Sequence, residues 1–194
     1  QSPAERAAGA VHRVAPQPRV GPGEVHQLED ARLRLGDKAG QARHLLDTPT
    51  SKIRSAAQGY VELYGVLEAL PDMQPRGPLT GKPCLWWRFR IEEYRSSGKK
   101  RSWRVIESGT SDAWLRLVDG TGECLIDPRG AEIRTAVRDV WQGNLRHPLG
   151  PAKTGLLGFL SSGTRYRYSE ERFHVGQPLY AIGDFRTRGA AQQG

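Results

Sequence analysis

Residues 59–133 decide the fold of this chain. They hold four runs rich in aromatic and branched apolar residues: GYVELYGVLE at 59–68, PCLWWRFRIEEY at 83–94, KRSWRVIE at 100–107 and AWLRLVDGTGECLIDP at 113–128. Apolar and polar residues alternate within the runs, which is typical of half-buried β-strands, and turns containing glycine or proline separate them. The stretch therefore predicts short, bent strands that pair into a sheet.

The second run illustrates how the alternation assigns side chains to faces. In a strand over 84–94, the expected inward side chains are Leu85, Trp87, Phe89 and Ile91. The expected outward side chains are Trp86, Arg88 and Arg90, because successive side chains of a strand point to opposite faces. In the first strand, expected over 60–70, Gly65 indicates a bulge or a sharp bend of a curled sheet.

Further strands are expected at 123–126, 131–135, 165–173 and 179–185. Short bent strands joined by glycine turns favour an antiparallel barrel or sandwich. We therefore expect a mostly β protein, with an OB-like barrel as the first choice. An SH3-like barrel or an open sandwich is the alternative.

Short helices are expected before the sheet. Val25, Leu28, Ala31 and Leu35 recur every three to four residues, which predicts an amphipathic helix over 24–35. A weaker helical pattern covers 39–46. Thr48 followed by Pro49 is typical of a helix start, for a short helix that ends near residue 57.

The chain divides into four segments on this interpretation. Residues 1–23 form a flexible tail, 24–58 a short helical segment, 59–186 the β domain and 187–194 a second flexible tail. Within the β domain, residues 136–163 contain many glycines and prolines and are expected to form a long irregular insertion.

Composition limits the possible partners. The chain has 194 residues, a formal net charge of +8 and a pI near 9.9, which suits nucleic acid, anionic lipid or an acidic protein surface. No apolar run is long enough for a transmembrane helix, and no signal peptide is recognised. Because the chain begins with Gln1 and has one methionine, Met73, we expect it to be part of a longer protein.

No catalytic or metal-ligating group emerges from the sequence, and no cofactor is expected. The five histidines are scattered, and no two have the spacing of metal ligands. Neither a nucleophile signature nor a phosphate-binding loop is present. Cys84 and Cys124 lie in expected strands, where burial as small apolar side chains is the first interpretation and a disulfide between them is the alternative.

Several motifs resemble the GIDE domain, also called the beside-a-membrane domain, over about residues 48–186. The motifs are TPTSKI (48–53), GYVELYG (59–65), PCLWWR (83–88), LVDGTG (117–122), PRGAE (128–132), YRYSEER (166–172) and LYAIGDF (179–185). Their order and spacing together are more specific than any one motif.

This resemblance implies a domain held beside a membrane by flanking helices outside the chain. In eukaryotic members a separate RING domain carries ubiquitin ligase activity. A RING needs eight Cys and His ligands, which this chain lacks. The resemblance therefore implies a non-catalytic domain of a prokaryotic membrane protein, on the extracytoplasmic (periplasmic) side, that senses, scaffolds or binds a partner.

The candidate partner-binding face combines basic residues with one tryptophan: Trp86, Arg88, Arg90, Lys99, Lys100 and Arg101. Such a face suits a protein partner or the headgroups of anionic lipids. A single-stranded nucleic-acid binder of the OB type is the alternative, because those proteins combine cationic grooves with exposed aromatic rings.

Overall fold

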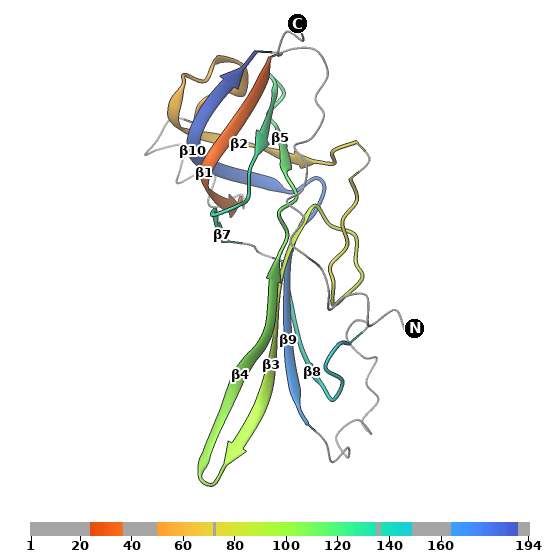
Figure 1. Ribbon diagram of the computed structural model, residues 1–194. Helices are drawn as coiled ribbons and strands as arrows, with labels where there is room; N and C mark the ends of the chain where they lie inside the picture. Colours follow the sequence, from red (N-terminus) through yellow and green to blue (C-terminus); the bar gives the residue numbers. More distant parts are fainter. Residues whose placement is uncertain (1–23, 37–49, 72, 135–136, 149–163, 190–194) are drawn as a thin grey trace, which may run out of the picture.

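The computed structural model describes residues 24–36, 50–71, 73–134, 137–148 and 164–189. In these ranges the chain forms ten β-strands and one 3-10 turn, Ile53–Ser55, so the prediction of a mostly β protein is confirmed. A closed barrel lies above an elongated sheet, which we call the arm (Figure 1). None of the described residues belongs to a helix that is long and apolar enough to cross a membrane.

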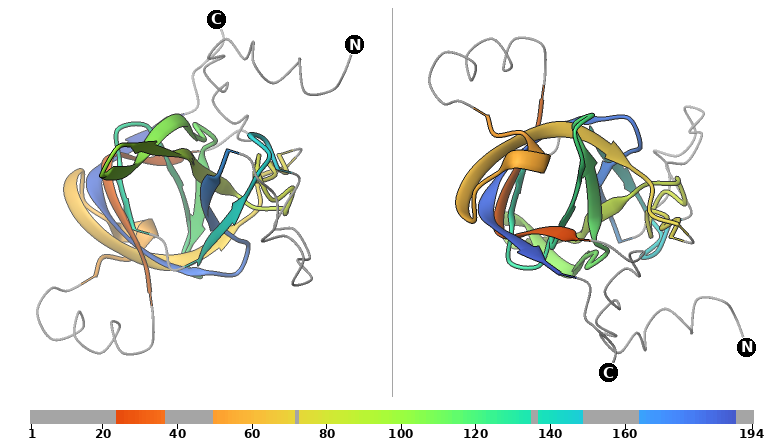
Figure 2. Two further views of the ribbon diagram at one scale, coloured as in Figure 1. Left: turned by 90° about the horizontal axis from the view of Figure 1, so that it is seen from below. Right: turned by 90° about the horizontal axis from the view of Figure 1, so that it is seen from above.

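Five strands close the barrel (Figure 2). They are β1 (Val25–Leu35), β2 (Gly59–Glu68), β5 (Leu115–Val118), β6 (Glu123–Ile126) and β10 (Pro178–Arg188). The order is β10-β2-β5-β6-β1, and β1 pairs back with β10; β7 (Glu132–Arg134) extends the sheet beyond β1. Closure confirms the expected barrel and excludes an open sandwich for this part. The barrel is not purely antiparallel, because β1 runs parallel to β6 and β7.

The predicted helix over 24–35 is wrong, because this segment is strand β1. A β-bulge explains the misleading pattern: the register between β1 and β10 shifts between Glu29 and Arg32, and Asp30 has φ of 49°. The extra residue lets Leu28 and Ala31 both face the core although they are three positions apart. A bulged strand thus acquired the spacing of a helix.

The other expected helices have different outcomes. The segment 39–46 and the start at Thr48 and Pro49 lie outside the described residues. The helix expected to follow them is present only as the 3-10 turn, whose Ile53 is completely buried. The predicted tail over 1–23 is also outside the described residues.

Gly65 acts through close approach rather than through a bulge. The pairing of β2 with β10 passes through Gly65 without a shift of register. A Cβ atom at Gly65 would lie 2.5 Å from the carbonyl oxygen of Val118. The glycine therefore leaves room for the backbone of β5, which pairs with β2 next to this position.

The arm is a separate four-stranded antiparallel sheet in the order β4-β3-β9-β8. Its strands are β3 (Trp86–Ser97), β4 (Lys100–Thr110), β8 (Val137–Gly143) and β9 (Tyr166–Phe173). The β3–β4 hairpin reaches farthest from the barrel (Figure 1). Its turn contains Gly98 at φ 57°, a conformation that glycine adopts readily.

Strand β8 corrects the expectation that 136–163 is irregular throughout. Val137, Asp139 and Trp141 share one face of this strand, and the carboxylate at the middle position pairs with Arg172 at 2.5 Å. A charged residue at an inward position hid the alternation. Residues 149–163 lie outside the described part. The predicted tail at 187–194 is wrong for Thr187 and Arg188, which belong to β10.

One face of the arm is covered by the segment that precedes β3. Leu79 packs on Ile91 and Tyr168. The completely buried carboxylate of Glu170 accepts hydrogen bonds from the backbone N–H of Leu79 (2.7 Å) and from the N–H and hydroxyl of Thr80. Arg172 pairs with the same carboxylate at 2.5 Å. This buried network fixes the loop against the sheet and leaves the opposite face open.

Candidate functional site: the basic arm and the pocket at its base

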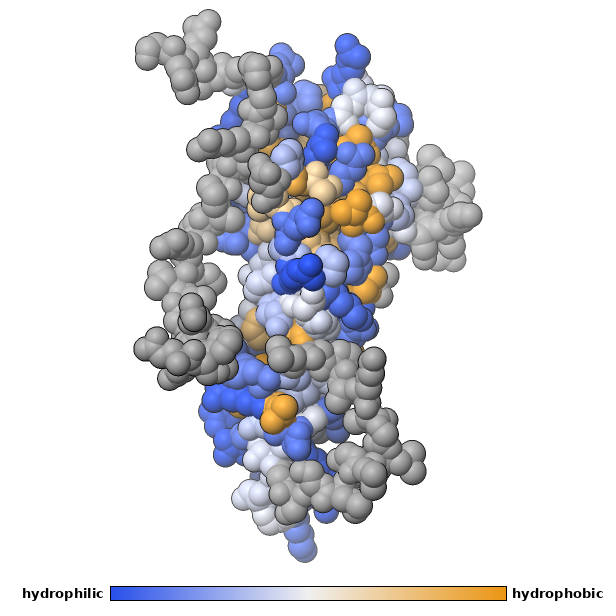
Figure 3. All heavy atoms as spheres, turned by 90° about the vertical axis from the view of Figure 1, so that its right-hand side faces the viewer, coloured by the Kyte–Doolittle hydropathy of each residue, from blue (hydrophilic) through white to orange (hydrophobic). Residues whose placement is uncertain are grey.

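The uncovered face of the arm carries rows of arginine and glutamate. The registers place Arg88 beside Glu171, and Glu171 beside Arg138. Two positions along, Arg90 stands beside Ser169 and, beyond it, the exposed Val140. Figure 3 views the side of the molecule that carries the segment before β3; there too the arm is mostly hydrophilic, whereas apolar side chains gather over the barrel above it. The uncovered face, with its rows of arginine and glutamate, can attract a charged partner.

Some of these charges neutralise each other. Arg167 donates hydrogen bonds to Glu92 at 2.7 and 2.8 Å. These bonds, more than the nearby charges of Arg90 and Arg138, hold the pKa of Glu92 below its usual value, although burial acts in the opposite direction. Arg88 is likewise paired with Glu171 through its Nε at 2.9 Å. Paired arginines are held in place and are less available to a ligand.

Two aromatic rings on this face are also occupied. The guanidinium of Arg167 lies 4.8 Å from the centre of the Trp103 ring, and that of Arg165 lies 5.6 Å from the Tyr94 ring. The two rings contact each other edge to face, with centroids 5.3 Å apart. Cation–π contacts of this kind rigidify the outer part of the arm.

The β3–β4 hairpin carries exposed cations that no described carboxylate pairs with. Five basic residues of the β3–β4 hairpin are exposed and form no ion pair with any carboxylate of the described residues: Arg90, Lys99, Lys100, Arg101 and Arg104. Most other described arginines are paired, as in Arg116–Glu123 and Arg129–Asp127. Positive charge that no described carboxylate neutralises is therefore concentrated at the hairpin.

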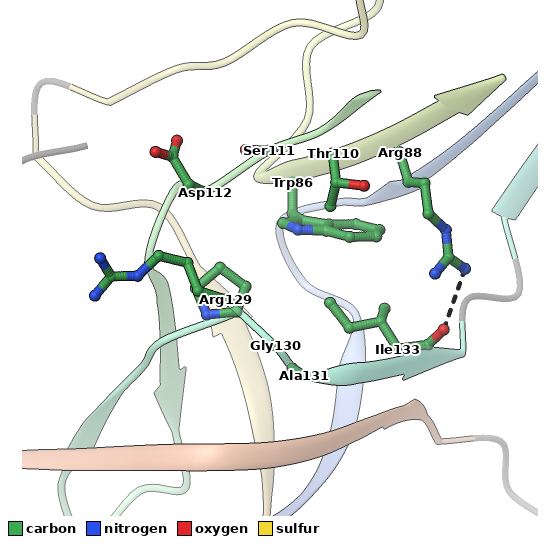
Figure 4. A pocket seen from close by; sticks show the side chains of 10 residues that line it. Trp86, Arg88, Thr110, Ser111, Asp112, Arg129, Gly130, Ala131 and Ile133 are labelled. Atoms are coloured by element: carbon green, nitrogen blue, oxygen red, sulfur yellow. Dashed lines mark hydrogen bonds between the residues drawn. The ribbon is translucent and has the colours of Figure 1, made fainter. Parts of the chain in front are cut away.

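A pocket of about 510 Å³ lies where the arm joins the barrel. Figure 4 shows Arg88 on one side, Asp112 and Arg129 on the other, and the Trp86 ring above Ile133. Arg88 donates a hydrogen bond of 3.2 Å to the carbonyl oxygen of Ile133. The volume falls within the range of small-molecule sites. Arg88 and Arg129 are each held by neighbouring protein groups, and the pocket forms a recess beside the basic face.

The prediction that Trp86 points outward is wrong. Its side chain is completely buried in the barrel core, beside Leu85 and Phe173. The predicted inward residues Trp87 and Phe89 are only partly buried. The strand leaves the barrel at this point, so its two ends pack against different cores, and one alternation cannot describe both.

The structure separates the six predicted partner-binding residues. Trp86 and Arg88 line the pocket at the base, whereas Lys99, Lys100 and Arg101 lie at the tip. A strand advances about 3.3 Å per residue, so about 35 Å separates the two ends of β3. The exposed Arg90 lies between them, on the open face.

Sequence reasoning missed the pocket. Its walls come from β3, the end of β4 and the turn at 128–131, which are brought together only by folding. The turn itself was recognisable from Pro128 and Gly130. No sequence signal indicated that it would face Arg88.

The two cysteines are free, so the alternative of a disulfide between them is wrong. Cys124 lies in the barrel core, and burial raises the pKa of its thiol to about 12. Burial, with a further contribution from the charge of Glu170, raises the pKa of Cys84 to about 11. Among the described residues no group of three or more His, Cys, Asp and Glu side chains could hold a metal ion.

Comparison with known proteins identifies one family. The model of the family GIDE, described as E3 ubiquitin ligase, matches residues 88–192, more than half of the chain. The match begins at Arg88 and includes the arm except Trp86 and Trp87, every residue that lines the pocket except Trp86, and the last strand of the barrel. No curated protein and no solved structure matches the chain.

Proposed function

The chain belongs to the GIDE family, which is associated with E3 ubiquitin ligases, and from this premise we propose that it is the extramembrane, non-catalytic domain of a prokaryotic membrane protein. Flanking helices outside the chain tether it, and it scaffolds or senses by binding a partner through the arm. The domain lies on the extracytoplasmic, periplasmic side. Its barrel is of the OB type, a five-stranded design suited to presenting a binding surface.

One observation carries this proposal: the two ends of the fold leave the barrel together, opposite the basic hairpin. Val25, the first residue of β1, pairs with Arg188, the last residue of β10. The start of β1 and the end of β10 lie at the end of the barrel farthest from the arm (Figure 1). A chain tethered at both ends would hold the barrel near the membrane and direct the arm away from it.

The pocket residues support a binding rather than a catalytic role. Arg129 is held by Asp127 at 2.5 Å, and Arg88 is held by Glu171 and by the carbonyl of Ile133. General acid–base catalysis needs a group free to exchange a proton near the operating pH. Guanidinium groups in ion pairs keep their protons and instead orient a bound carboxylate or phosphate.

The structure does not favour the alternative of a single-stranded nucleic-acid binder. That alternative relied on Trp86 as a stacking platform, and this ring is buried in the barrel core. The remaining rings on the open face, Tyr94 and Trp103, are covered by arginines. Binding of single-stranded DNA is therefore an outcome to be tested rather than the favoured function.

The experiment uses the full-length protein in its own cells. Resistance to alkaline carbonate extraction would show an integral membrane protein, and digestion of the domain by protease added to intact spheroplasts would show the periplasmic side. Release by carbonate would overturn the tether. Protection from protease in spheroplasts, with digestion after lysis, would overturn the predicted side.

Partner binding by the arm is tested in the same cells with the triple variant K99S/K100S/R101S. We expect this variant to remain in the membrane and to lose the crosslinked species that the wild type forms through a photo-reactive residue at Ser102. A control that removes three exposed cations from the barrel instead, R34S/K52S/R54S, has the same charge change and should retain them. Equal crosslinking by all three proteins would contradict the role of the hairpin tip.

A further inference from the structure

Strand β4 forms one edge of the arm. Among the strands that the structure describes, it pairs only with β3. Seven of the eleven residues from Lys100 to Thr110 are exposed, and Val105 is an apolar side chain at 46 % exposure. Exposed edge strands present unpaired backbone groups that another strand can engage.

The direction of the free backbone groups follows from one hydrogen bond. Tyr94 donates its N–H to the carbonyl of Arg165, away from β4. Tyr94 pairs with Trp103 in the register, so this pair is not hydrogen-bonded between β3 and β4. The backbone N–H and C=O groups of Trp103, and of Val105 two residues on, therefore point out from the edge.

Charge decides what can pair there. Lys100, Arg101 and Arg104 lie along β4, and Lys99 immediately precedes it. A second copy of the arm would bring the same cations against them, which disfavours self-association. An acidic strand would meet four cations that have no partner among the described residues.

The position of the arm selects a protein over lipid. In the tethered arrangement proposed above, on which this step rests, the hairpin lies at the end of the molecule remote from the tether (Figure 1). Headgroups of that membrane attract cations only within about a Debye length, roughly 8–10 Å. The β3 strand alone spans about 35 Å. The hairpin therefore faces other molecules.

We propose that β4 is a docking edge for an acidic, extended segment of a partner protein, which adds to the arm sheet as an additional strand. The backbone groups of Trp103 and Val105 give the pairing, and the hairpin cations select the charge. This is strand addition, in which main-chain hydrogen bonds provide affinity and side chains provide specificity.

The test titrates the purified chain with labelled peptides of about ten residues, the length of a long strand. One peptide alternates threonine and glutamate, a second alternates proline and glutamate, and a third alternates threonine and lysine. The first should bind at least tenfold more tightly than the other two. The proline peptide has the charge, but every second residue lacks an N–H donor and the proline rings oppose strand geometry, and the lysine peptide has the wrong charge. Equal binding of both acidic peptides, or no binding of the first, would overturn the proposal.

Amide hydrogen exchange of the wild-type chain gives a readout that needs no variant. The threonine–glutamate peptide should slow exchange at Trp103 and Val105, whose N–H groups point outward, and leave Arg104 nearly unchanged. Unchanged exchange at Trp103 and Val105 in the bound state would exclude strand addition.

Variants separate charge from pairing. Val105→Pro should lower binding of the threonine–glutamate peptide to the level of the proline peptide. R101E/R104E should abolish binding of both acidic peptides, whereas K52E/R54E on the barrel should change it less than twofold. The same variants are then tested with vesicles containing phosphatidylglycerol in place of the peptide. Val105→Pro and R101E/R104E should bind these vesicles no differently from wild type. A loss of vesicle binding only in R101E/R104E would point to lipid and contradict the proposal. These measurements use the purified chain without a membrane. Failure of peptide binding would therefore leave the proposed membrane tether standing, and loss of the tether would leave the peptide result standing.

Discussion

Trp86 lies directly opposite Phe173 where the arm leaves the barrel, with ring centroids 5.4 Å apart and both side chains completely buried. This pair is the first row of the arm sheet and also part of the barrel core. The contact between these two rings therefore joins the arm to the hydrophobic core of the barrel. Trp86 thus anchors the arm in the barrel core and is not exposed for stacking on bases.

Trp86→Ala should lower the free energy of unfolding by about 3–5 kcal/mol, because removing a buried indole leaves a cavity between barrel and arm. Urea unfolding followed by circular dichroism measures the change. Val105→Ala, at an exposed position of β4, is the control and should change stability by less than about 0.5 kcal/mol. A Trp86→Ala protein as stable as wild type would contradict the burial of this ring.

Glu170→Ala should destabilise the protein by about 3–5 kcal/mol, because it leaves the buried guanidinium of Arg172 with one partner fewer and frees the N–H groups of Leu79 and Thr80. Urea unfolding measures the loss. Glu123→Ala, which breaks the more exposed pair with Arg116, should cost no more than about 1 kcal/mol. Similar losses in both variants would show that burial does not distinguish the two pairs.

Asp119→Asn should be less stable than wild type by about 1–3 kcal/mol at neutral pH. The carboxylate accepts bonds from the N–H groups of Ile53 (2.9 Å) and Thr121 (2.8 Å), and so ties the β5–β6 turn to the 3-10 turn. Burial acts to raise the pKa of Asp119, but bonds from the Thr121 hydroxyl and from the backbone hold it below its usual value.

The same carboxyl gives a pH dependence. A lowered pKa means that its stabilisation is complete above the ordinary aspartate value of about 3.9 and is lost as pH falls through the value in the folded state. The difference in unfolding free energy between wild type and Asp119→Asn should therefore be constant from pH 7 to about 5 and shrink in more acidic solution. A difference that grew with acidity would contradict the assignment.

Gly65→Ala should destabilise the barrel by several kcal/mol, because the new Cβ would lie 2.5 Å from the backbone oxygen of Val118, which cannot move away cheaply. Thermal unfolding measures the effect. Gly122→Ala is a matched control in the adjoining turn: its Cβ would come no closer than 3.4 Å, to a side-chain methyl of Ile53. Comparable melting temperatures for the two variants would exclude close approach as the role of Gly65.

Both cysteines should resist alkylation by iodoacetamide at pH 8 in the native protein and react once it is unfolded. Burial raises the pKa of Cys84 to about 11 and of Cys124 to about 12, so little thiolate is present. Mass spectrometry counts the modified thiols. Of the two, Cys84 should react first. Rapid labelling of Cys124 in the folded state would contradict its place in the barrel core.

Part of the fold could be predicted because local patterns carried it. Alternation identified β2, β3, β4, β5 and β6, and glycine marked their turns. The prediction failed where tertiary contacts changed the pattern. In β1 the bulge at Asp30 moved Leu28 and Ala31 onto one face, and in β8 an inward Asp139 broke the apolar alternation.

The candidate site was predictable to a similar extent. The cations Lys99, Lys100 and Arg101 were evident from their clustering in a hairpin turn. It was not evident that these three cations would have no ion-pair partner among the described residues, since Arg88 is equally basic in sequence and is paired with Glu171. Pairing depends on which strand lies beside which.

By itself, the sequence determined a mostly β protein, its principal strands and its basic hairpin, because side-chain alternation and turn chemistry are local properties. Only the tertiary structure decided that β1 closes the barrel against β10, that Trp86 is buried and that β4 remains an open edge. These features depend on contacts between residues far apart in the chain, such as Val25 with Arg188 and Trp86 with Phe173. Such contacts are set by the packing of the whole core rather than by any one stretch.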